Sequence, residues 1–325
     1  MSYLTPGAPG GGRRGSPFPA PGNGLSSPAG LTPPGLSGGA RPGAGRTAAG
    51  AGAPGLGVPG YAHPLVAPME WAELTRPATP LHWAVLNVAN GPGSRPDPHC
   101  LAAAGRLTNA RLRVLGHLDL AYGGRPLAEL VADARRFLDW YRVGGFYLDR
   151  CPAGRAELPH VRRVTATLET LLDAGPGGGG PYGSRSRPYD RGPYDSGPYD
   201  SGSYGGSPYG GSPYDGGYLV LGHGIHPHPG YAAAADQLVT FSGPWSDYRW
   251  SQAAAWTAEY PPERFVHLVH GVPRTHLDEA LRIARWQGAG TVFFTDRGAG
   301  ANRPFENLPG FWDEFVSRIG RRVLE

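Results

Sequence analysis

Residues 113–149 read RVLGHLDLAYGGRPLAELVADARRFLDWYRVGGFYLD, and this stretch decides the fold. It opens and closes with short apolar runs, RVLGHLDL and GGFYLD, each with an aspartate at or near its end. Between them, across residues 126–141, apolar side chains recur every three or four positions, which predicts a helix with one buried face. Pro126 stands where a first helical position is expected. A strand, a helix and a second strand in this order are typical of a parallel βαβ unit.

The same alternation runs through most of the chain. A further amphipathic segment starts at Thr275, with Asp278 three residues later in an approximate capping box. Eight strands alternating with helices predict an α/β protein with a closed (β/α)8 barrel of the TIM type. A doubly wound open sheet is the alternative, although no Gly-rich phosphate loop follows any run. The expected strands are PLVAP (64–68), HWAVLNV (82–88), RVLGHLDL (113–120), GGFYLD (144–149), GYLVLGHG (217–224), DQLVTFSG (236–243), RFVHLVHG (264–271) and GTVFFTD (290–296).

Two tracts account for much of the 53 Gly and 36 Pro. Residues 1–60 have few large apolar groups to offset ordering entropy, so we expect a disordered tail. In residues 175–217 a tyrosine returns every five positions from Tyr189 to Tyr214, which fits neither helix nor strand and predicts a disordered low-complexity insertion. The barrel domain is therefore expected over 61–325. The insertion is interpreted as a tolerated loop expansion; the alternative is self-association through tyrosine and arginine contacts.

Charge and cysteine content limit the partners. Every basic residue is arginine, and the net charge of +4 is spread along the chain, which argues against a nucleic-acid-binding face. Cys100 and Cys151 lack the paired spacing of a zinc site, so we expect free thiols, no metal and no cofactor. We find neither a signal-peptide core nor a membrane-length apolar window, which predicts a cytoplasmic protein without membrane attachment. Export without a signal peptide is the alternative.

Polar residues follow the predicted strands at their carboxyl ends, which in a barrel share one mouth. Asn90, within NGPG, is interpreted first as a turn residue. Asp149 closes an apolar strand, where a carboxylate is costly to bury unless it is paired or hydrogen-bonded, and this favours a functional role. His117 and His270 are equally well explained as half-buried structural histidines. The residues expected at the mouth are Asn87, Asn90, His117, Asp119, Asp149, Arg150, His223, Ser242, His270 and Asp296.

Several of these residues lie in motifs that carry a family resemblance. In chain order the motifs are NVANGPG (87–93), GHLDLAYG (116–123), WY (140–141), FYLD (146–149) and NRPFENLP (302–309). Together they resemble the spherulin 4 family, or spherulation-specific family 4. The resemblance implies a (β/α)8 barrel similar to glycoside hydrolases, whose characterised relatives cleave α-1,4-linked galactosamine-type polymers. It also implies an Asp-Glu pair after the fourth strand and a glutamate after the sixth. Asp149 matches the first acid, whereas Arg150 and Ser242 stand at the glutamate positions.

Asp119 is the expected second catalytic acid beside Asp149. Glycoside hydrolysis usually needs two carboxyl groups about 5–5.5 Å or about 6.5–9.5 Å apart. Asp119 ends the neighbouring strand, whereas Asp296 ends the eighth strand, across the ring. We expect Arg150 to lean toward Asp149 and keep it ionised, which leaves proton donation to Asp119 or to a histidine, His117 or His270.

Sugar binding is expected to use aromatic faces and hydrogen-bonding groups around the mouth. For Trp245 and Tyr248 the alternative is packing against the next helix. The predicted binding residues are Asn90, His117, Tyr122, His223, Trp245, His270 and Asp296.

Three functions stay open at this point. The first is a glycosidase with a rearranged set of acids. The second is a carbohydrate-binding barrel that has lost the reaction, since a fold does not guarantee its function. The third is an assembly protein that recruits partners through its two low-complexity tracts.

Overall fold

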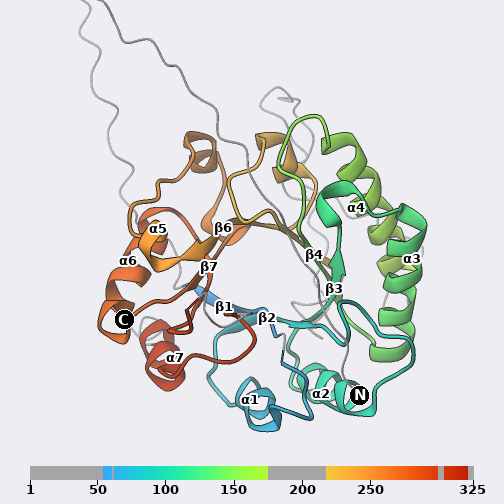
Figure 1. Cartoon of the computed structure of the whole chain (residues 1–325), viewed down its shortest axis with the longest axis horizontal. Helices are drawn as coiled ribbons and strands as arrows, with labels where there is room; N and C mark the ends of the chain where they lie inside the picture. Colours follow the sequence, from blue (N-terminus) through green and yellow to red (C-terminus); the bar gives the residue numbers. More distant parts are fainter. Residues whose placement is uncertain (1–53, 61, 175–216, 299–303, 321–325) are drawn as a thin grey trace, which may run out of the picture. The chain divides into compact units, whose positions relative to one another are not determined.

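A closed barrel of eight parallel strands forms the centre of the protein, in the order β1 to β8 (Figure 1). The computed structural model describes residues 54–60, 62–174, 217–298 and 304–320. The predicted (β/α)8 barrel is confirmed. The strands are β1 (Gly55–Val58), β2 (Leu81–Leu86), β3 (Val114–Asp119), β4 (Gly145–Asp149), β5 (Tyr218–Gly222), β6 (Gln237–Pro244), β7 (Phe265–His270) and β8 (Thr291–Phe294).

Helices surround this barrel and cover its outer face (Figure 1). Within the part of the chain that the structure describes, no helix combines the length and apolar character needed to cross a lipid bilayer. The helices are α1 (Pro68–Glu73), α2 (Pro98–Asn109), α3 (Leu127–Arg136), α4 (Leu158–Asp173), α5 (Trp245–Tyr248), α6 (Leu277–Trp286) and α7 (Trp312–Gly320). Single turns are η1 (Ala121–Gly123), the π-helical η2 (Phe137–Tyr141), η3 (Pro229–Ala233), η4 (Ala255–Glu259), η5 (Pro262–Arg264) and η6 (Arg274–His276).

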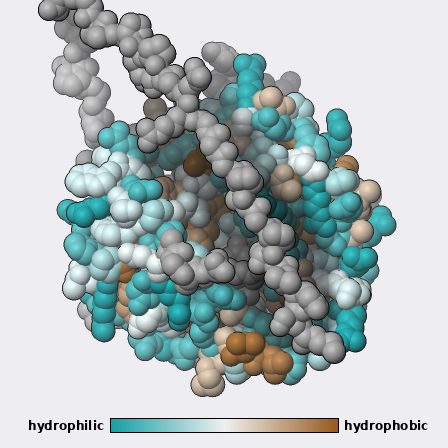
Figure 2. Space-filling view, viewed as in Figure 1, coloured by the Kyte–Doolittle hydropathy of each residue, from teal (hydrophilic) through white to brown (hydrophobic). Residues whose placement is uncertain are grey.

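The first strand is not where the sequence pattern put it. PLVAP forms a turn that leads into α1, and its Leu65 and Val66 are exposed; Figure 2 shows apolar surface over the α1 region. The strand is GLGV instead, inside the range assigned to the tail, so the barrel starts before residue 61. Close packing explains the glycines of this strand, since a Cβ on Gly57 would lie 2.5 Å from the Trp83 ring. The rest of the expected tail, up to residue 53, and the insertion over 175–216 lie outside the described residues.

The helix expected over 126–141 is present, with one change of geometry. Pro126 is its N-cap, α3 ends at Arg136, and the last residues form the π-turn η2. The capping box expected at Thr275 is wrong, because α6 starts at Leu277 with His276 as its N-cap.

Glycine also brings α3 close to the sheet. A Cβ on Gly116 of β3 would lie 2.7 Å from the Phe137 ring, so only a glycine leaves room for that ring. Phe137 is fully buried there. This contact fixes the outer side of β3 and turns the alternate positions, including His117 and Asp119, toward the barrel interior.

The inside of the barrel contains a satisfied polar layer. Trp83 Nε1 donates to Gln237 Oε1 at 2.7 Å, and Gln237 Nε2 donates to Thr291 Oγ1 at 2.8 Å. Thr291 Oγ1 also lies 2.8 Å from His82 Nδ1. Buried polar groups that are fully hydrogen-bonded favour one packing arrangement, so this layer holds strands β2, β6 and β8 in fixed positions.

Candidate functional site

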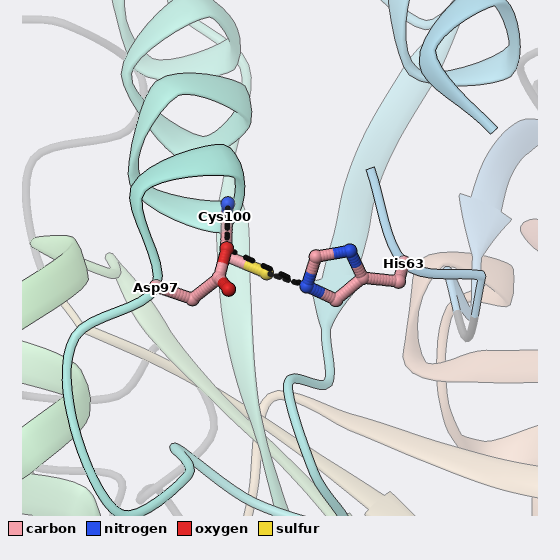
Figure 3. Close-up of side chains that lie close together, drawn as sticks. All are labelled: His63, Asp97 and Cys100. Carbon is pink, nitrogen blue, oxygen red and sulfur yellow. Dashed lines mark hydrogen bonds and ion pairs between the residues drawn. The ribbon is translucent and has the colours of Figure 1, made fainter. Parts of the chain in front are cut away.

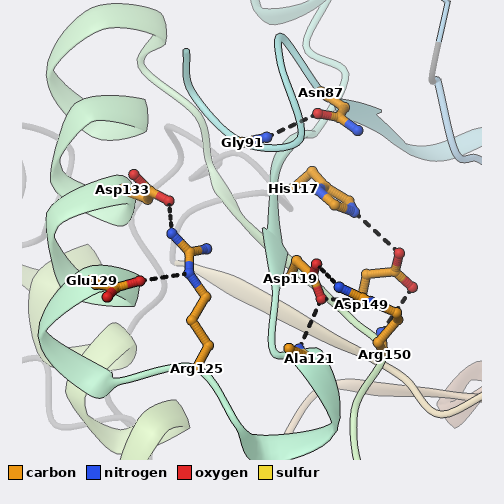
Figure 4. Close-up of polar contacts among 10 residues, drawn as sticks. All are labelled: Asn87, Gly91, His117, Asp119, Ala121, Arg125, Glu129, Asp133, Asp149 and Arg150. Carbon is orange, nitrogen blue, oxygen red and sulfur yellow. Dashed lines mark hydrogen bonds and ion pairs between the residues drawn. The ribbon is translucent and has the colours of Figure 1, made fainter. Parts of the chain in front are cut away.

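The candidate site is built on the paired ends of β3 and β4. The two strands pair in parallel with Asp119 opposite Asp149 and His117 opposite Tyr147. Neighbouring strands lie about 4.8 Å apart and paired positions face the same side of a sheet. Both carboxylates therefore stand beside each other at the mouth of the barrel (Figure 4).

Asp119 is held as a buried carboxylate by a guanidinium group. Arg150 Nε donates to Asp119 Oδ1 at 2.8 Å, and Arg150 Nη2 donates to the other oxygen. The amide of Ala121 also donates to Oδ1, at 2.8 Å. Burial alone would raise the pKa of Asp119, but these hydrogen bonds outweigh it and hold the pKa below its usual value. Asp119 is therefore ionised and cannot supply a proton near neutral pH.

The prediction that the Arg150 side chain leans toward Asp149 is wrong, because its partner is Asp119. Arg150 has a left-handed backbone, with φ of 48°. Its amide donates to Asp149 Oδ1 at 2.9 Å, while its guanidinium turns back to Asp119 on the neighbouring strand (Figure 4). A non-glycine residue in this conformation is uncommon and such residues concentrate at functional sites.

Asp149 is the accessible acid of the pair. Its Oδ2 lies 3.2 Å from Nε2 of His117, and 32% of its side chain is exposed. His117 is buried, and its ring stacks on Tyr147 with 6.4 Å between the centroids. A buried imidazole packed in this way fixes the direction of the Asp149 carboxylate and leaves its other edge toward solvent.

Two loop residues complete the cluster. Asn90, after β2, has φ of 53°, and its side chain helps to lower the pKa of Asp119. Tyr122, after β3, has φ of 56° and is 66% exposed, and its ring centroid lies 5.8 Å from Cζ of Arg150. Asn90, Asp119, Tyr122, Asp149 and Arg150 together form what we call the mouth cluster.

Comparison with known proteins agrees with this architecture. The family model for spherulation-specific family 4 matches residues 56–319. The chain belongs to spherulation-specific family 4. No curated protein matches it in sequence.

Two solved structures are similar to the chain. The crystal structure of Aspergillus clavatus Sph3 in complex with GalNAc is 20% identical, with a TM-score of 0.61, over 83% of this chain and 98% of that chain. A GH18 chitinase from Pseudoalteromonas aurantia is 13% identical, with a TM-score of 0.44, over 81% of this chain and 99% of that chain. At such identities the likeness to Sph3 establishes a common fold.

This member of spherulation-specific family 4 has two further histidines at strand ends. His223 follows β5, with Nδ1 3.0 Å from the Pro152 carbonyl oxygen and its ring edge-on to Tyr231. Burial lowers the pKa of His223 to about 4, so this imidazole is neutral at pH 7. His270 ends β7 with its ring against Phe305, and burial lowers its pKa as well. Their role in sugar binding stays a prediction.

The aromatic residues after β6 pack instead of lining the mouth. Tyr248 is fully buried, with its hydroxyl 2.8 Å from Nδ1 of His267, so it packs, although against residues of the barrel strands and not against the next helix. Trp245 is buried between the rings of Tyr248 and His276. Its ring faces are therefore closed to a sugar, and the expectation of stacking at Trp245 is wrong.

The last two residues expected at the mouth lie at the ends of β6 and β8. Ser242 is exposed, in register with Leu268 of β7, and carries no acid. Asp296 is exposed, and its Oδ1 accepts a hydrogen bond from the Gly310 amide at 3.1 Å. Asp296 thus ties the loop after β8 to the segment before α7.

Sequence reasoning also missed one partly buried histidine in the loop after β5. His226, after β5, lies close enough to the buried His267 to affect it electrostatically. The signal was present in the run GHGIHPHPG, three histidines in an otherwise apolar loop directly after a strand.

Proposed function

We propose that this protein binds an amino-sugar polysaccharide of the galactosamine type at the mouth of its barrel and does not hydrolyse it. The observation that carries the proposal is the bidentate pair between Arg150 and Asp119 beside the accessible Asp149. Membership of spherulation-specific family 4 and the GalNAc complex of Sph3 support the ligand class.

The absence of hydrolysis follows from the charges in the cluster. Most glycosidases need one carboxylic acid to protonate the leaving group and a second carboxylate as nucleophile or base. Asp119 is locked in its ionised form by Arg150, so it cannot be the acid. Arg150 and Ser242 occupy the positions where the family resemblance implies glutamates. One accessible carboxylate, Asp149, is then left between β3 and β4.

The same groups suit ligand binding. The outer edge of Asp149 can accept hydrogen bonds from sugar hydroxyls or pair with the ammonium group of an unacetylated galactosamine. Arg150, half exposed, can donate its remaining N–H groups to a hydroxyl or to an acetamido oxygen. The Tyr122 ring beside them offers an open apolar face to a pyranose.

A second candidate is a glycosidase that uses Asp149 and His117. The 3.2 Å contact between Asp149 Oδ2 and His117 Nε2 favours it, because a histidine is a competent proton donor. In this alternative Asp149 would act as nucleophile, and His117 would have to move from its buried position to reach a leaving group.

The test uses the full chain with α-1,4-linked galactosamine oligomers, both acetylated and deacetylated. Calorimetry should show binding, and a reducing-end assay on the same mixtures should show no cleavage. Asp149→Asn and Tyr122→Ala should each weaken binding about tenfold, the equivalent of about 1.4 kcal/mol. Asp139→Asn, on an exposed acid of the outer helical layer, is the control and should bind normally.

Each result has a definite meaning. Equal binding by the wild type and Asp149→Asn would contradict the proposed site. Reducing ends that appear with the wild type and vanish with Asp149→Asn would establish the glycosidase candidate instead.

A further inference from the structure

Three side chains of metal-ligand type meet on two neighbouring loops at the mouth side of the barrel. His63 lies in the loop after β1, and Asp97 and Cys100 lie at the start of α2 (Figure 3). Their ligand atoms all lie within 4.8 Å of one another, and theirs is the one group of this kind within the described ranges. It shares no residue with the mouth cluster.

The distances in this group match the edges of a metal-centred tetrahedron. His63 Nε2 is 3.4 Å from Asp97 Oδ1 and 3.5 Å from Cys100 Sγ. Around a tetrahedral zinc ion, with bonds of about 2.0–2.1 Å to nitrogen or oxygen and about 2.3 Å to sulfur, the N···O edge is about 3.3–3.4 Å and the S···N edge about 3.5–3.6 Å. An ion can therefore enter with little movement of the ligands.

The donor set selects the kind of ion. One imidazole, one carboxylate and one thiol suit zinc, whereas calcium and magnesium prefer oxygen ligands alone. Access is open, because the His63 and Asp97 side chains are 29% and 28% exposed while Cys100 is buried behind them. A water molecule or His99, whose ring centroid lies 6.3 Å from that of His63, can fill the fourth position.

The helix start holds two of these ligands in place. Asp97 is the N-cap of α2, and its Oδ1 accepts hydrogen bonds at 2.9 Å from the amides of His99 and Cys100. The amide of Asp97 donates to the hydroxyl of the buried Tyr141 at 3.0 Å. Ligating carboxylates are commonly supported in this way by hydrogen bonds from outside the metal site.

His63, the third ligand, must give up one weak hydrogen bond in order to bind the metal. Nδ1 of His63 accepts a hydrogen bond from the Leu65 amide at 3.2 Å, at an exposed position. Coordination through Nε2 places the ring proton on Nδ1, so this hydrogen bond is given up. A single exposed hydrogen bond contributes little compared with three coordinate bonds.

A hydrolytic Cys-His-Asp triad does not explain the group. Burial, with the nearby Asp97 adding to it, raises the pKa of the Cys100 thiol to about 12, so the thiol is not an activated nucleophile. A divalent ion changes this situation, because it binds the thiolate and displaces the thiol proton to solvent.

We propose that His63, Asp97 and Cys100 bind a zinc ion that ties the loop after β1 to the start of α2. The ion would also anchor the far end of the loop between β2 and α2, the loop that carries Asn90. The site is argued from its own ligands and stands whether or not the mouth binds sugar.

The experiment uses the full chain, reduced and stripped of metal with a chelator, and cobalt(II) as a spectroscopic probe. Titration should produce a thiolate-to-cobalt charge-transfer band that saturates at one ion per chain and disappears when zinc is added. Zinc should also raise the melting temperature. No charge-transfer band with the wild type would overturn the proposal.

The two cysteines provide a matched pair of variants. Cys100→Ser should abolish the band, whereas Cys151→Ser, at the other buried free thiol, should retain it. Asp97→Asn keeps an effective helix cap and should lower the ion affinity at least about tenfold, since even the loss of an indirect partner of a metal ligand typically costs that much. A band that persists in Cys100→Ser, or an unchanged affinity in Asp97→Asn, would contradict the assignment.

Discussion

Replacing Arg150 with glutamine tests the charge arrangement of the mouth cluster. The change removes both guanidinium hydrogen bonds to Asp119, one of which measures 2.8 Å, and keeps the bond from the Ala121 amide. A hydrogen bond to a charged group contributes about 1.5–3 kcal/mol, and an exposed ion pair about 0.2–1 kcal/mol. Asp119 is 8% exposed but Arg150 is 48% exposed, so solvent screens part of the interaction. We therefore expect the variant to lose about 1–3 kcal/mol of unfolding free energy at pH 7.

The pH dependence gives the sharper result. In the wild type the folded-state pKa of Asp119 lies below its unfolded value, so the stabilisation is complete above the unfolded pKa and is lost as pH falls through the folded pKa. In Arg150→Gln the burial of Asp119 is less opposed and the pKa rises. The stability difference between the two proteins should therefore be largest at pH 7 and should be smaller at about pH 3, which lies below the unfolded pKa of an aspartate and closer to the lowered folded pKa of Asp119.

The measurement is urea unfolding followed by tryptophan fluorescence at the two pH values, supported by thermal melting. A loss of about 1–3 kcal/mol corresponds to a fall in melting temperature of roughly 2–12 °C for a domain of this size. Arg155→Gln is the control, an exposed arginine of the same loop without an ion pair to any residue that the structure describes. A difference of equal size at both pH values, or no difference at pH 7, would refute the reasoning.

Three further predictions follow from packing, burial and the family pattern. Gly145→Ala should lower the free energy of unfolding, measured in urea, by at least about 2 kcal/mol, because the new Cβ would lie 2.1 Å from a backbone oxygen of β5. Gly105→Ala in α2, which has open space around it, should raise that free energy by about 0.5–1 kcal/mol. Equal effects of the two substitutions would contradict this prediction. His223 has a pKa near 4 when folded against 6.5 as an ordinary histidine, so stability should fall as pH drops between these values; His223→Gln should flatten that slope, and an unchanged slope would argue against it. The double variant Arg150→Glu with Ser242→Glu supplies both missing acids and should release reducing ends from galactosamine oligomers; a folded, ligand-binding double variant that releases none would show that these acids are not sufficient.

Local patterns were enough to predict most of the barrel. Strands such as VLGHLD and GFYLD are short, apolar and followed by helical periodicity, and these properties depend on near neighbours in the chain. The same logic failed at β1, because GLGV has the composition of a flexible segment and becomes a strand through packing against Trp83. The prediction for the aromatic residues after β6 failed for a related reason, since sequence does not show that the Trp245 ring packs against His276 of η6.

The sequence alone predicted the class of fold and the place of Asp119 beside Asp149 at adjacent strand ends, which follow from periodicity and from residue identity at each position. The family resemblance added the expectation of glutamates where Arg150 and Ser242 stand. Only the tertiary structure decided which acid Arg150 neutralises, because the left-handed backbone at Arg150 and the register of β3 with β4 set the direction of its side chain. It likewise decided that Cys100 meets His63 and Asp97 instead of the other cysteine, since the parallel pairing of β1 with β2 brings the loops that follow these two strands together.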